Sequence, residues 1–536
     1  LIAAAVSATA LFGSMSVSAA ETTQDTLTVA MGSDATSIDP VAVCNVYSSN
    51  IMAQIYDTLI DVAEDGTVTP RLAESYEVSD DGLTYTFKIR QGVKFHNGDE
   101  LKASDVAYSL KRAQASAAVA HIFGDIDPDS FEVPDDYTVS FKLQQQNTGF
   151  IAGLANTGAS IVPEAVVEAE GDNFGSNPIG TGPFKFVSWT KNDTIELERN
   201  DDYFGEEPAL SKITFRIITE ATNRAIELES GGVDMAFDIS TNDISRVEDN
   251  SNLQLIRKVD NQTTFLAFNC EKEPWSNPDV RQAISYALDT TAICNAVWRG
   301  VGAPAAGPIA PNVKYHDNDL TPHEYNVEKA KELLAAAGIQ EGQKLVISTN
   351  ERQERIDMAT IIQSQLKEVG IDVEIEVLEW GALLDKADRR EQDAIMVGWT
   401  CQTADPDMAV YAVFHSQTNG RVGNNYANFS SEKVDELLEK GRSMPDSEDR
   451  EAVYKELQEE IAAEAPWVFL NNGEVVVGAK ANMKGFEPTA YGYHPLYNIY
   501  LSKCCRKSGF TTGEAAASPF PMRKTERKDV YAKICR

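Results

Sequence analysis

The chain has 536 residues, of which 43% are hydrophobic and 24% are charged, so it can form two or three domains and is not disordered throughout. Asp and Glu number 82 against 47 Lys and Arg, which gives a formal net charge of -35 at pH 7. This negative excess argues against nucleic acid or an anionic membrane surface as partner and is typical of a soluble extracytoplasmic protein.

The first twenty residues differ in composition from the rest of the chain. Residues 1–20 contain no charged side chain, are apolar through Leu11 and Phe12, and end on small residues before Glu21. This pattern predicts a cleaved export signal that lacks its front end. The apolar stretch is too short to cross a membrane, and no lipid-anchoring cysteine follows it. We therefore expect export to the periplasm or another extracytoplasmic compartment.

The last segment, residues 504–536, also stands apart. It contains eight basic and three acidic residues, three of the seven cysteines, and no apolar periodicity. We predict that it is a disordered extension or is not native to the fold; its net charge of 8 - 3 = +5 leaves the rest of the chain with -35 - 5 = -40. A basic interaction tail is the alternative.

Strands and helices alternate irregularly in the first half of the chain. The predicted elements are a strand at 27–31, a helix at 48–60, a helix at 104–110 capped by Ser104, a strand at 137–143, and strands at 184–189 and 194–199. Asp81-Gly82 lies between two alternating runs within 76–89, which predicts a β-hairpin. Gly180-Thr181-Gly182 is typical of a turn and precedes the strands at 184–189 and 194–199.

The second half shows a more regular alternation of helices and strands. The predicted elements are a helix from Pro278 with Asn277 as its N-cap, a helix at 327–337, a strand at 344–348, a helix at 356–369, a strand at 371–378, helices at 434–440 and 450–463, a Gly/Asn-rich turn and a strand at 474–477. This order predicts a second lobe of α/β type.

Few residues point to catalysis or to a bound cofactor. The sequence has no HExxH, GxSxG, GxxxxGK[ST] or CxxC motif. Its six histidines are scattered without the spacing of metal ligands, and the many Asp and Glu residues single out no acid/base pair. We predict no cofactor and no enzymatic activity; a hydrolase is the least favoured alternative.

Four cysteines lie in the body of the chain: Cys44, Cys270, Cys294 and Cys401. Cys270 follows an apolar run at 265–268 and Cys401 follows another at 394–399. The two thiols can meet if these strands are neighbours, so we hypothesise a Cys270–Cys401 disulfide. The alternative is that all four cysteines are small buried hydrophobic residues.

Four motifs, in order, carry a resemblance that covers residues 27–503. They are the segment 72–111 with Gly92-Val93-Lys94-Phe95-His96-Asn97-Gly98, then Gly180-Thr181-Gly182-Pro183-Phe184, Asn277-Pro278-Asp279-Val280-Arg281-Gln282-Ala283, and Gly398-Trp399 to Asp405-Pro406. In these the chain resembles the family 5 extracellular solute-binding proteins of peptide/nickel ABC importers. The resemblance implies a non-catalytic, monomeric protein that passes an oligopeptide or similar small solute to a membrane permease.

The resemblance also implies an α/β, two-lobed periplasmic-binding-protein-like fold with a hinge between the lobes. The implied parts are a lobe I core of residues 27–56, 179–262 and 479–503, an extra subdomain of lobe I at 57–178, and lobe II at 270–478. The chain would cross between the lobes near Asp260 to Asn269 and again near Val475 to Ala481.

The ligand-binding residues are implied in the same way. One wall of the site corresponds to the loop that contains Cys44, Asn45 and Tyr47, and the opposite wall to Trp380 and Trp399. Flat aromatic faces bury variable side chains without demanding one shape, which suits peptide binding. Ordinary core packing is the alternative for both tryptophans.

The sequence departs from the family pattern where peptide binders hold the α-amino group of the ligand. The pattern has Asp three residues after the Trp of Gly-Trp, and this chain has Gln402. Some members have Arg three residues before that Trp, and this chain has Met396. Since a buried ammonium without a carboxylate is costly, Gln402 favours a neutral or hydroxylated ligand, or a peptide held elsewhere by its terminus.

Other charged residues are candidates for the ligand's termini. Arg352 and Arg355 can bind a ligand carboxylate, although both also fit a solvated helix start. Asp405 can replace the missing acid, although its place before Pro406 favours a structural turn. An oligosaccharide is one alternative ligand; a metal chelate of nickel type is another, and rests only on His415 in the loop after Asp405-Pro406.

Overall fold

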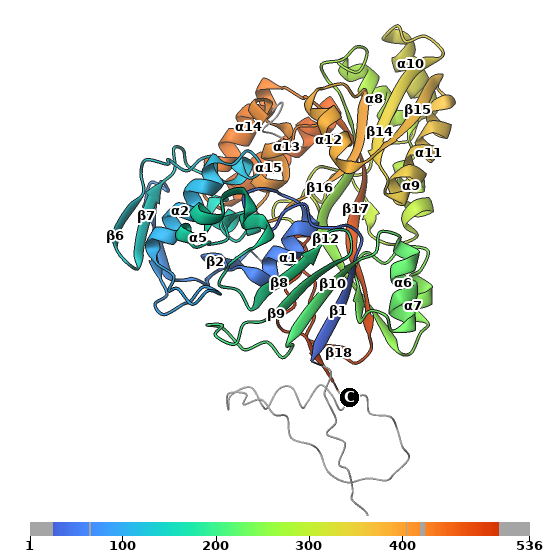
Figure 1. Cartoon of the computed structure of the whole chain (residues 1–536). Helices are drawn as coiled ribbons and strands as arrows, with labels where there is room; N and C mark the ends of the chain where they lie inside the picture. Colours follow the sequence, from blue (N-terminus) through green and yellow to red (C-terminus); the bar gives the residue numbers. More distant parts are fainter. Residues whose placement is uncertain (1–24, 64–65, 404, 419–423, 503–536) are drawn as a thin grey trace, which may run out of the picture. The chain divides into compact units, whose positions relative to one another are not determined.

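The computed structural model describes residues 25–63, 66–403, 405–418 and 424–502 (Figure 1). The predicted leader and the basic tail lie outside the described residues. The largest element is an eleven-stranded mixed sheet. From edge to edge its strands are β15 (Ile371–Leu378), β14 (Gln343–Asn350), β16 (Ala394–Thr400), β12 (Leu253–Phe268), β17 (Trp467–Lys480), β11 (Met235–Ala236), β1 (Thr26–Met31), β10 (Lys212–Ile217), β9 (Thr194–Arg199) and β8 (Phe184–Thr190), with β13 (Ala303–Pro304) on β17.

One end of this sheet has the α/β order that the second half of the sequence predicts. β14 pairs in parallel with β15 and with β16, and the connections are α11 (Gln353–Lys367) and α12 (Trp380–Asp388). α8 (Pro278–Ala287) begins as predicted, because the side chain of Asn277 accepts a hydrogen bond from Asp279 N at 2.9 Å. A right-handed crossover between parallel strands places such helices on the faces of the sheet.

The other end of the sheet begins with the first strand of the chain. β1 pairs in parallel with β10 and with β11, and β9 and β8 extend the sheet as an antiparallel pair, as predicted for that pair. α1 (Val46–Ile55) follows β1, and its buried residues Ile51, Met52 and Ile55 join the apolar core of this end.

α1 ends five residues before the predicted boundary. Tyr56 is extended, and the carbonyl oxygen of Ile55 accepts a hydrogen bond from Gly182 N at 2.9 Å. A Cβ atom at Gly180 would lie 2.2 Å from the same oxygen, so only glycine permits this approach. The helix prediction was wrong beyond residue 55 because a tertiary contact takes over the last helical carbonyl.

Two long strands, β12 (green in Figure 1) and β17 (red-orange), run side by side through both ends of the sheet. Their antiparallel register shifts between Val259 and Thr263 and again between Thr264 and Phe265. The predicted Gly/Asn-rich turn, residues 471–473, is part of the continuous strand β17. Residues 471–473 lie opposite these register shifts, so they form part of a β-bulge instead of a chain reversal.

A separate four-stranded sheet, β4-β5-β7-β6, is formed by β4 (Ala73–Val78), β5 (Thr84–Ile89), β6 (Glu132–Asp135) and β7 (Thr138–Lys142). The β4–β5 hairpin confirms the Asp81-Gly82 prediction. The N-cap residue of α2 (Ala103–Ala115) is Lys102 and not the predicted Ser104, and Asp105 closes the first turn by accepting from Lys102 N at 2.9 Å. The helix also continues beyond its predicted end at Leu110.

The core of this small sheet continues into helices far along the sequence. Phe87 and Phe141 belong to the same apolar cluster as Leu438 and Tyr454. Those residues lie on α14 (Glu432–Ser443) and α15 (Glu448–Glu464), which confirm the two predicted helices. The segment 57–178 therefore packs against these helices through a shared core.

The remaining elements connect these layers. They are β2 (Ile60–Val62), β3 (Val68–Pro70), β18 (Met483–Lys484), β19 (Tyr500–Leu501), α3 (Ala120–Phe123), α4 (Phe150–Gly153), α5 (Glu164–Glu170), α6 (Ala221–Ser230), α7 (Ile244–Glu248), α9 (Thr290–Trp298), α10 (Val327–Ala336), α13 (Asp407–Phe414) and the 3-10 turns Thr157–Ala159, Gly171–Ser176 and Ser416–Thr418. Within the described ranges, no helix has both the length and the apolar character needed to cross a membrane.

The hypothesised Cys270–Cys401 disulfide is wrong. Strands β12 and β16 are neighbours, as the hypothesis requires, but they run antiparallel, with Phe268 opposite Ala394 and Gln262 opposite Thr400. Cys270 and Cys401 therefore lie beyond opposite ends of a ladder that is itself roughly 20 Å long at about 3.4 Å per residue, whereas a disulfide needs Cα atoms within about 7 Å. Both thiols are free.

We predict that both thiols remain free in protein that has never been reduced. Burial raises the pKa of Cys270 to about 11 and that of Cys401 to about 12, so neither forms the reactive thiolate at neutral pH. Alkylation under denaturing, non-reducing conditions should label both residues fully in a peptide map. A cross-linked Cys270–Cys401 peptide would contradict the strand register.

Candidate ligand-binding site

Three predicted site residues lie where parallel strands of one end of the large sheet finish. Arg352 follows β14, Trp380 follows β15, and Trp399 lies near the end of β16. The carboxyl ends of parallel strands meet at one edge of a sheet, and in open α/β sheets ligands bind at that edge. The register, with Thr349 opposite Met396, places these ends side by side.

Two further side chains lie at the matching edge of the other end of the sheet. Tyr47 is in the first turn of α1 after β1, and Asp238 lies two residues beyond the end of β11, which is parallel to β1. Asp238 has a left-handed backbone (φ +52°), uncommon for a residue with a side chain. Its carbonyl oxygen accepts from Arg224 Nη2 at 2.8 Å, which fixes the loop.

The two strand edges that carry these residues both lie next to the register shifts between β12 and β17. The last residue of β16, Thr400, lies opposite Gln262 of β12, and β11 runs parallel to β12 on the other side of β17. Asp260 lies within the interrupted register, and its carboxylate accepts from Gln262 N at 2.8 Å. The strand topology therefore brings residues from both ends of the sheet to one site around Asp260.

The charged groups of this site shift one another's pKa values. Burial, and then the charge of Asp238, raise the pKa of Tyr47, while Arg352 and Arg355 lower it. Burial lowers the pKa of Arg352, but Glu354, Asp238 and Tyr47 outweigh it, so that this pKa is raised. The site thus combines two guanidinium groups, a phenol and carboxylates.

The two arginines differ in how they are held. Arg352 pairs with Glu354 at 3.3 Å and lies over the ring of Trp298 at 5.5 Å. Arg355 is only 7% exposed and donates to the side-chain oxygen of Asn350 at 2.9 Å. Burial and the neighbouring Arg352 lower its pKa. Among the described residues Arg355 has no carboxylate partner, so its guanidinium can form an ion pair with an anionic group of a ligand.

Gln402, the residue that departs from the family pattern, has its oxygen already engaged. Its Oε1 accepts from Asn156 Nδ2 at 2.7 Å and from Cys44 Sγ at 3.6 Å, and the residue is 8% exposed. Because both donors face the oxygen, the amide NH2 group is the end that is directed elsewhere. Position 402 therefore offers a ligand a hydrogen-bond donor, which suits an acceptor and not an ammonium.

Two other predicted site residues are occupied by contacts within the protein. Asn45 is the N-cap of α1: its side-chain oxygen accepts from Ser48 N at 2.9 Å and its amide donates to Thr36 Oγ1 at 3.0 Å. Asp405 binds the guanidinium of Arg450 through both oxygens, at 2.8 and 2.9 Å. These contacts match the structural role of Asp405, which was the alternative to ligand binding.

Both tryptophans are half-buried. Trp380 and Trp399 pack against the same apolar cluster, to which the partly buried Cys44 also packs. Trp399 donates from Nε1 to Met408 O at 2.9 Å and meets the ring of His121 edge to face at 6.0 Å. Neither is fully buried core, and each retains exposed ring surface for a ligand.

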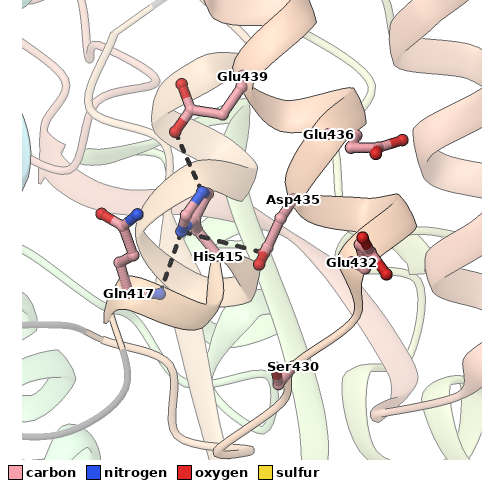
Figure 2. A pocket seen from close by; sticks show the side chains of 7 residues that line it. All are labelled: His415, Gln417, Ser430, Glu432, Asp435, Glu436 and Glu439. Carbon is pink, nitrogen blue, oxygen red and sulfur yellow. Dashed lines mark hydrogen bonds and ion pairs between the residues drawn. The ribbon is translucent and has the colours of Figure 1, made fainter.

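His415, on which the metal-chelate alternative rests, borders a separate acidic cavity of about 600 Å³ (Figure 2). His415 is 2% exposed. Its Nδ1 accepts from Gln417 N at 3.1 Å, so Nε2 carries the proton and faces Glu439 at 3.1 Å. The part of the chain that the structure describes contains no group of three His, Cys, Asp or Glu side chains arranged to hold a metal ion.

Sequence reasoning missed Asp238, Asp260 and Asn156 as members of this site. Asp260 carries a signal: the polar run Asp260-Asn261-Gln262 interrupts a long strand that is otherwise rich in apolar residues. Asp238 and Asn156 carry none, because only the tertiary fold brings them beside Tyr47 and Gln402.

The fold and the site together define a two-lobed solute-binding protein, and comparisons with known proteins agree. The Helicobacter pylori periplasmic binding protein DppA, solved with the peptide STSA, has 31% identity and a TM-score of 0.84, with 90% of this chain and 99% of that chain covered. The heme-binding protein A of Haemophilus influenzae is 29% identical, covering 83% of this chain and 86% of its own. The glutathione-binding protein GsiB of Salmonella paratyphi A is 30% identical, covering 85% and 91%.

The family model described as bacterial extracellular solute-binding proteins, family 5 middle, matches residues 67–421. The chain belongs to this family, whose members deliver peptides or other small solutes to ABC transporters. The resemblance predicted from the four motifs is confirmed, and so is the two-lobed α/β fold.

Proposed function

We propose that this chain captures a peptide or peptide-like solute between its two lobes and presents it to the transmembrane subunits of an ABC importer. The ligand's carboxylate binds Arg352 and Arg355, and its side chains lie against Tyr47, Trp380 and Trp399. The observation that carries the proposal is Arg355, a buried guanidinium without a carboxylate partner among the described residues, at the edge where both sets of parallel strands end.

Closure of the lobes on the ligand is the mechanism that follows from this arrangement. Arg352 and Arg355 lie at one end of the sheet, and Tyr47 and Asp238 at the other. A ligand that contacts both groups favours the closed form by its differential contacts. The irregular register of β12 and β17 around Asp260 is the proposed hinge, with 27–56, 179–262 and 479–503 as lobe I core, 57–178 as its subdomain and 270–478 as lobe II.

The remaining parts of the proposal concern partners and location. The protein acts as an extracytoplasmic monomer after removal of residues 1–20, binds no nucleic acid, and catalyses no reaction. The families of its relatives support the transport role, since those relatives are binding proteins of transporters. Asn45, Cys44, Gln402 and Asp405 complete the site by shaping its walls, mainly through contacts within the protein.

Ligand retained on purification tests the proposal directly. Denatured protein should release a small peptide or peptide-like acid detectable by mass spectrometry. Calorimetric titration of the emptied protein with glutathione and with the peptide STSA should show binding of at least one, since related proteins are named for or solved with these molecules. Binding of oligosaccharides alone, or of a nickel chelate alone, would overturn the substrate class.

A further inference from the structure

Three charged side chains at the candidate site lack an oppositely charged partner within 4 Å among the described residues: Arg355, Asp238 and Asp260. Buried carboxylates elsewhere differ in this respect. Asp405 pairs with Arg450, and Asp407 pairs with Arg442 at 2.8 Å. Asp238 is exposed to solvent, whereas Arg355 is buried and Asp260 is half-buried. Since desolvated charges are normally paired, the unpaired Arg355 and Asp260 point to a ligand that supplies the missing charges.

Asp260 is positioned so that one of its oxygens is available. Oδ1 accepts from Gln262 N, which leaves Oδ2 without a hydrogen-bond donor in the described part of the chain. Gly473 of β17 lies beside it, and a Cβ atom there would be 3.1 Å from Oδ2. The absence of a side chain at position 473 therefore leaves room next to this oxygen.

The charges that face Asp260 come from three other elements. They are Arg352 at the start of α11, Asp238 after β11 and Glu474 of β17. The pKa of Asp260 is raised to about 7, chiefly by burial and to a smaller extent by Asp238 and Glu474, against the opposing effects of the Gln262 N–H and Arg352. Glu474 is itself paired with Arg257 at 2.7 Å, so Asp260 is the carboxylate that lacks a cation.

The position at which the family pattern holds the ligand's amino group is closed to an ammonium in this chain. Gln402 has its oxygen engaged by Asn156, and its free end is a donor. The nearby acid, Asp405, is held by both nitrogens of Arg450. Any ammonium on the ligand must therefore find another carboxylate.

We propose that Asp260, with Asp238 beside it, binds a cationic nitrogen of the ligand, and that the ligand is a zwitterion whose carboxylate binds Arg352 and Arg355. The inference rests on the proposed function, because it assigns the opposite charge of the same bound solute. It places the ammonium at the hinge, where β12 crosses between the lobes, instead of beside Gln402.

Calorimetric titration with glutathione and STSA, each with its amine free or acetylated, tests the assignment. Acetylation should weaken binding to the wild-type protein about tenfold to hundredfold, the range of a charge-assisted hydrogen bond. Asp260→Asn should weaken binding of the free amines by the same factor and leave the acetylated probes unchanged. Asp129→Asn, which alters an exposed carboxylate of the small sheet's connection, is the matched control and should change neither.

The pH dependence gives a second readout. Because the ligand-free Asp260 is partly protonated near pH 7, a free-amine probe should bind about five- to tenfold more weakly at pH 6 than at pH 7.5. Asp260→Asn should remove this dependence. If that variant does not fold, Asp238→Asn and the acetylated probes on the wild-type protein carry the same comparison.

The outcomes separate this inference from the proposed function. Failure of both free-amine probes to bind the wild-type protein would overturn the peptide-like substrate class and the inference with it. Binding that is equal for free and acetylated probes, or equal in wild type and Asp260→Asn, would overturn the ammonium site alone and leave the transport role in place.

Discussion

Replacement of Arg450 by methionine is expected to lower the free energy of unfolding by about 3 to 5 kcal/mol, the usual cost of breaking a buried ion pair from one side. The side chain of Arg450 is fully buried on α15 and binds both oxygens of Asp405. It also donates to Asp446 at 2.9 Å and to Gly441 O at 2.8 Å. Without it, the carboxylate of Asp405 stays desolvated and unpaired.

Urea unfolding followed by tryptophan fluorescence measures this effect. Arg389→Met, which removes an exposed arginine paired with Glu391, is the control and should leave the unfolding midpoint almost unchanged. The double variant Arg450→Met, Asp405→Asn should be less destabilised than the single arginine variant, because it removes the stranded charge. An unaltered midpoint for Arg450→Met would mean that Asp405 is free to serve the ligand site.

Local signals allowed most of the secondary structure to be predicted. The Asp81-Gly82 hairpin, the Asn277-Pro278 helix start and the individual strands β14 and β15 all depend on residues within a few positions of one another. The failures have a different origin. α1 ends at Ile55 because Gly182, far along the chain, binds its last carbonyl, and residues 471–473 remain in a strand because β12 lies opposite.

The candidate site could be predicted only in part for the same reason. Arg352 and Trp380 follow predicted strands and Trp399 lies near the end of an apolar run, so the alternation of strands and helices was enough to predict that they share one edge of the sheet. The roles of Asp405 and Asp260 depend on partners in distant segments, Arg450 and β17. The failed disulfide shows the same limit, because apolar runs predict two strands but neither that they are neighbours nor that they run antiparallel.

Replacement of Arg355 by methionine should separate ligand affinity from stability. We expect affinity for the bound probe, glutathione or STSA, to fall about 100-fold, since two charge-assisted hydrogen bonds to a carboxylate are lost. The ligand-free protein should be equally stable or more stable by about 1 kcal/mol, because a buried guanidinium without a counter-ion is removed. Titration calorimetry and urea unfolding give the two quantities.

Arg281 provides the matched control, since it is also a buried arginine without a carboxylate partner among the described residues. Its guanidinium donates instead to the main-chain carbonyls of Trp275, Ser276, Glu464 and Ala465. Arg281→Met should leave these carbonyls unpaired, cost about 3 kcal/mol of stability and keep ligand affinity. If Arg355→Met also lost stability and kept ligand affinity, Arg355 would be a structural residue. A guanidinium that binds the ligand requires the opposite result for Arg355→Met, namely lost affinity and retained stability.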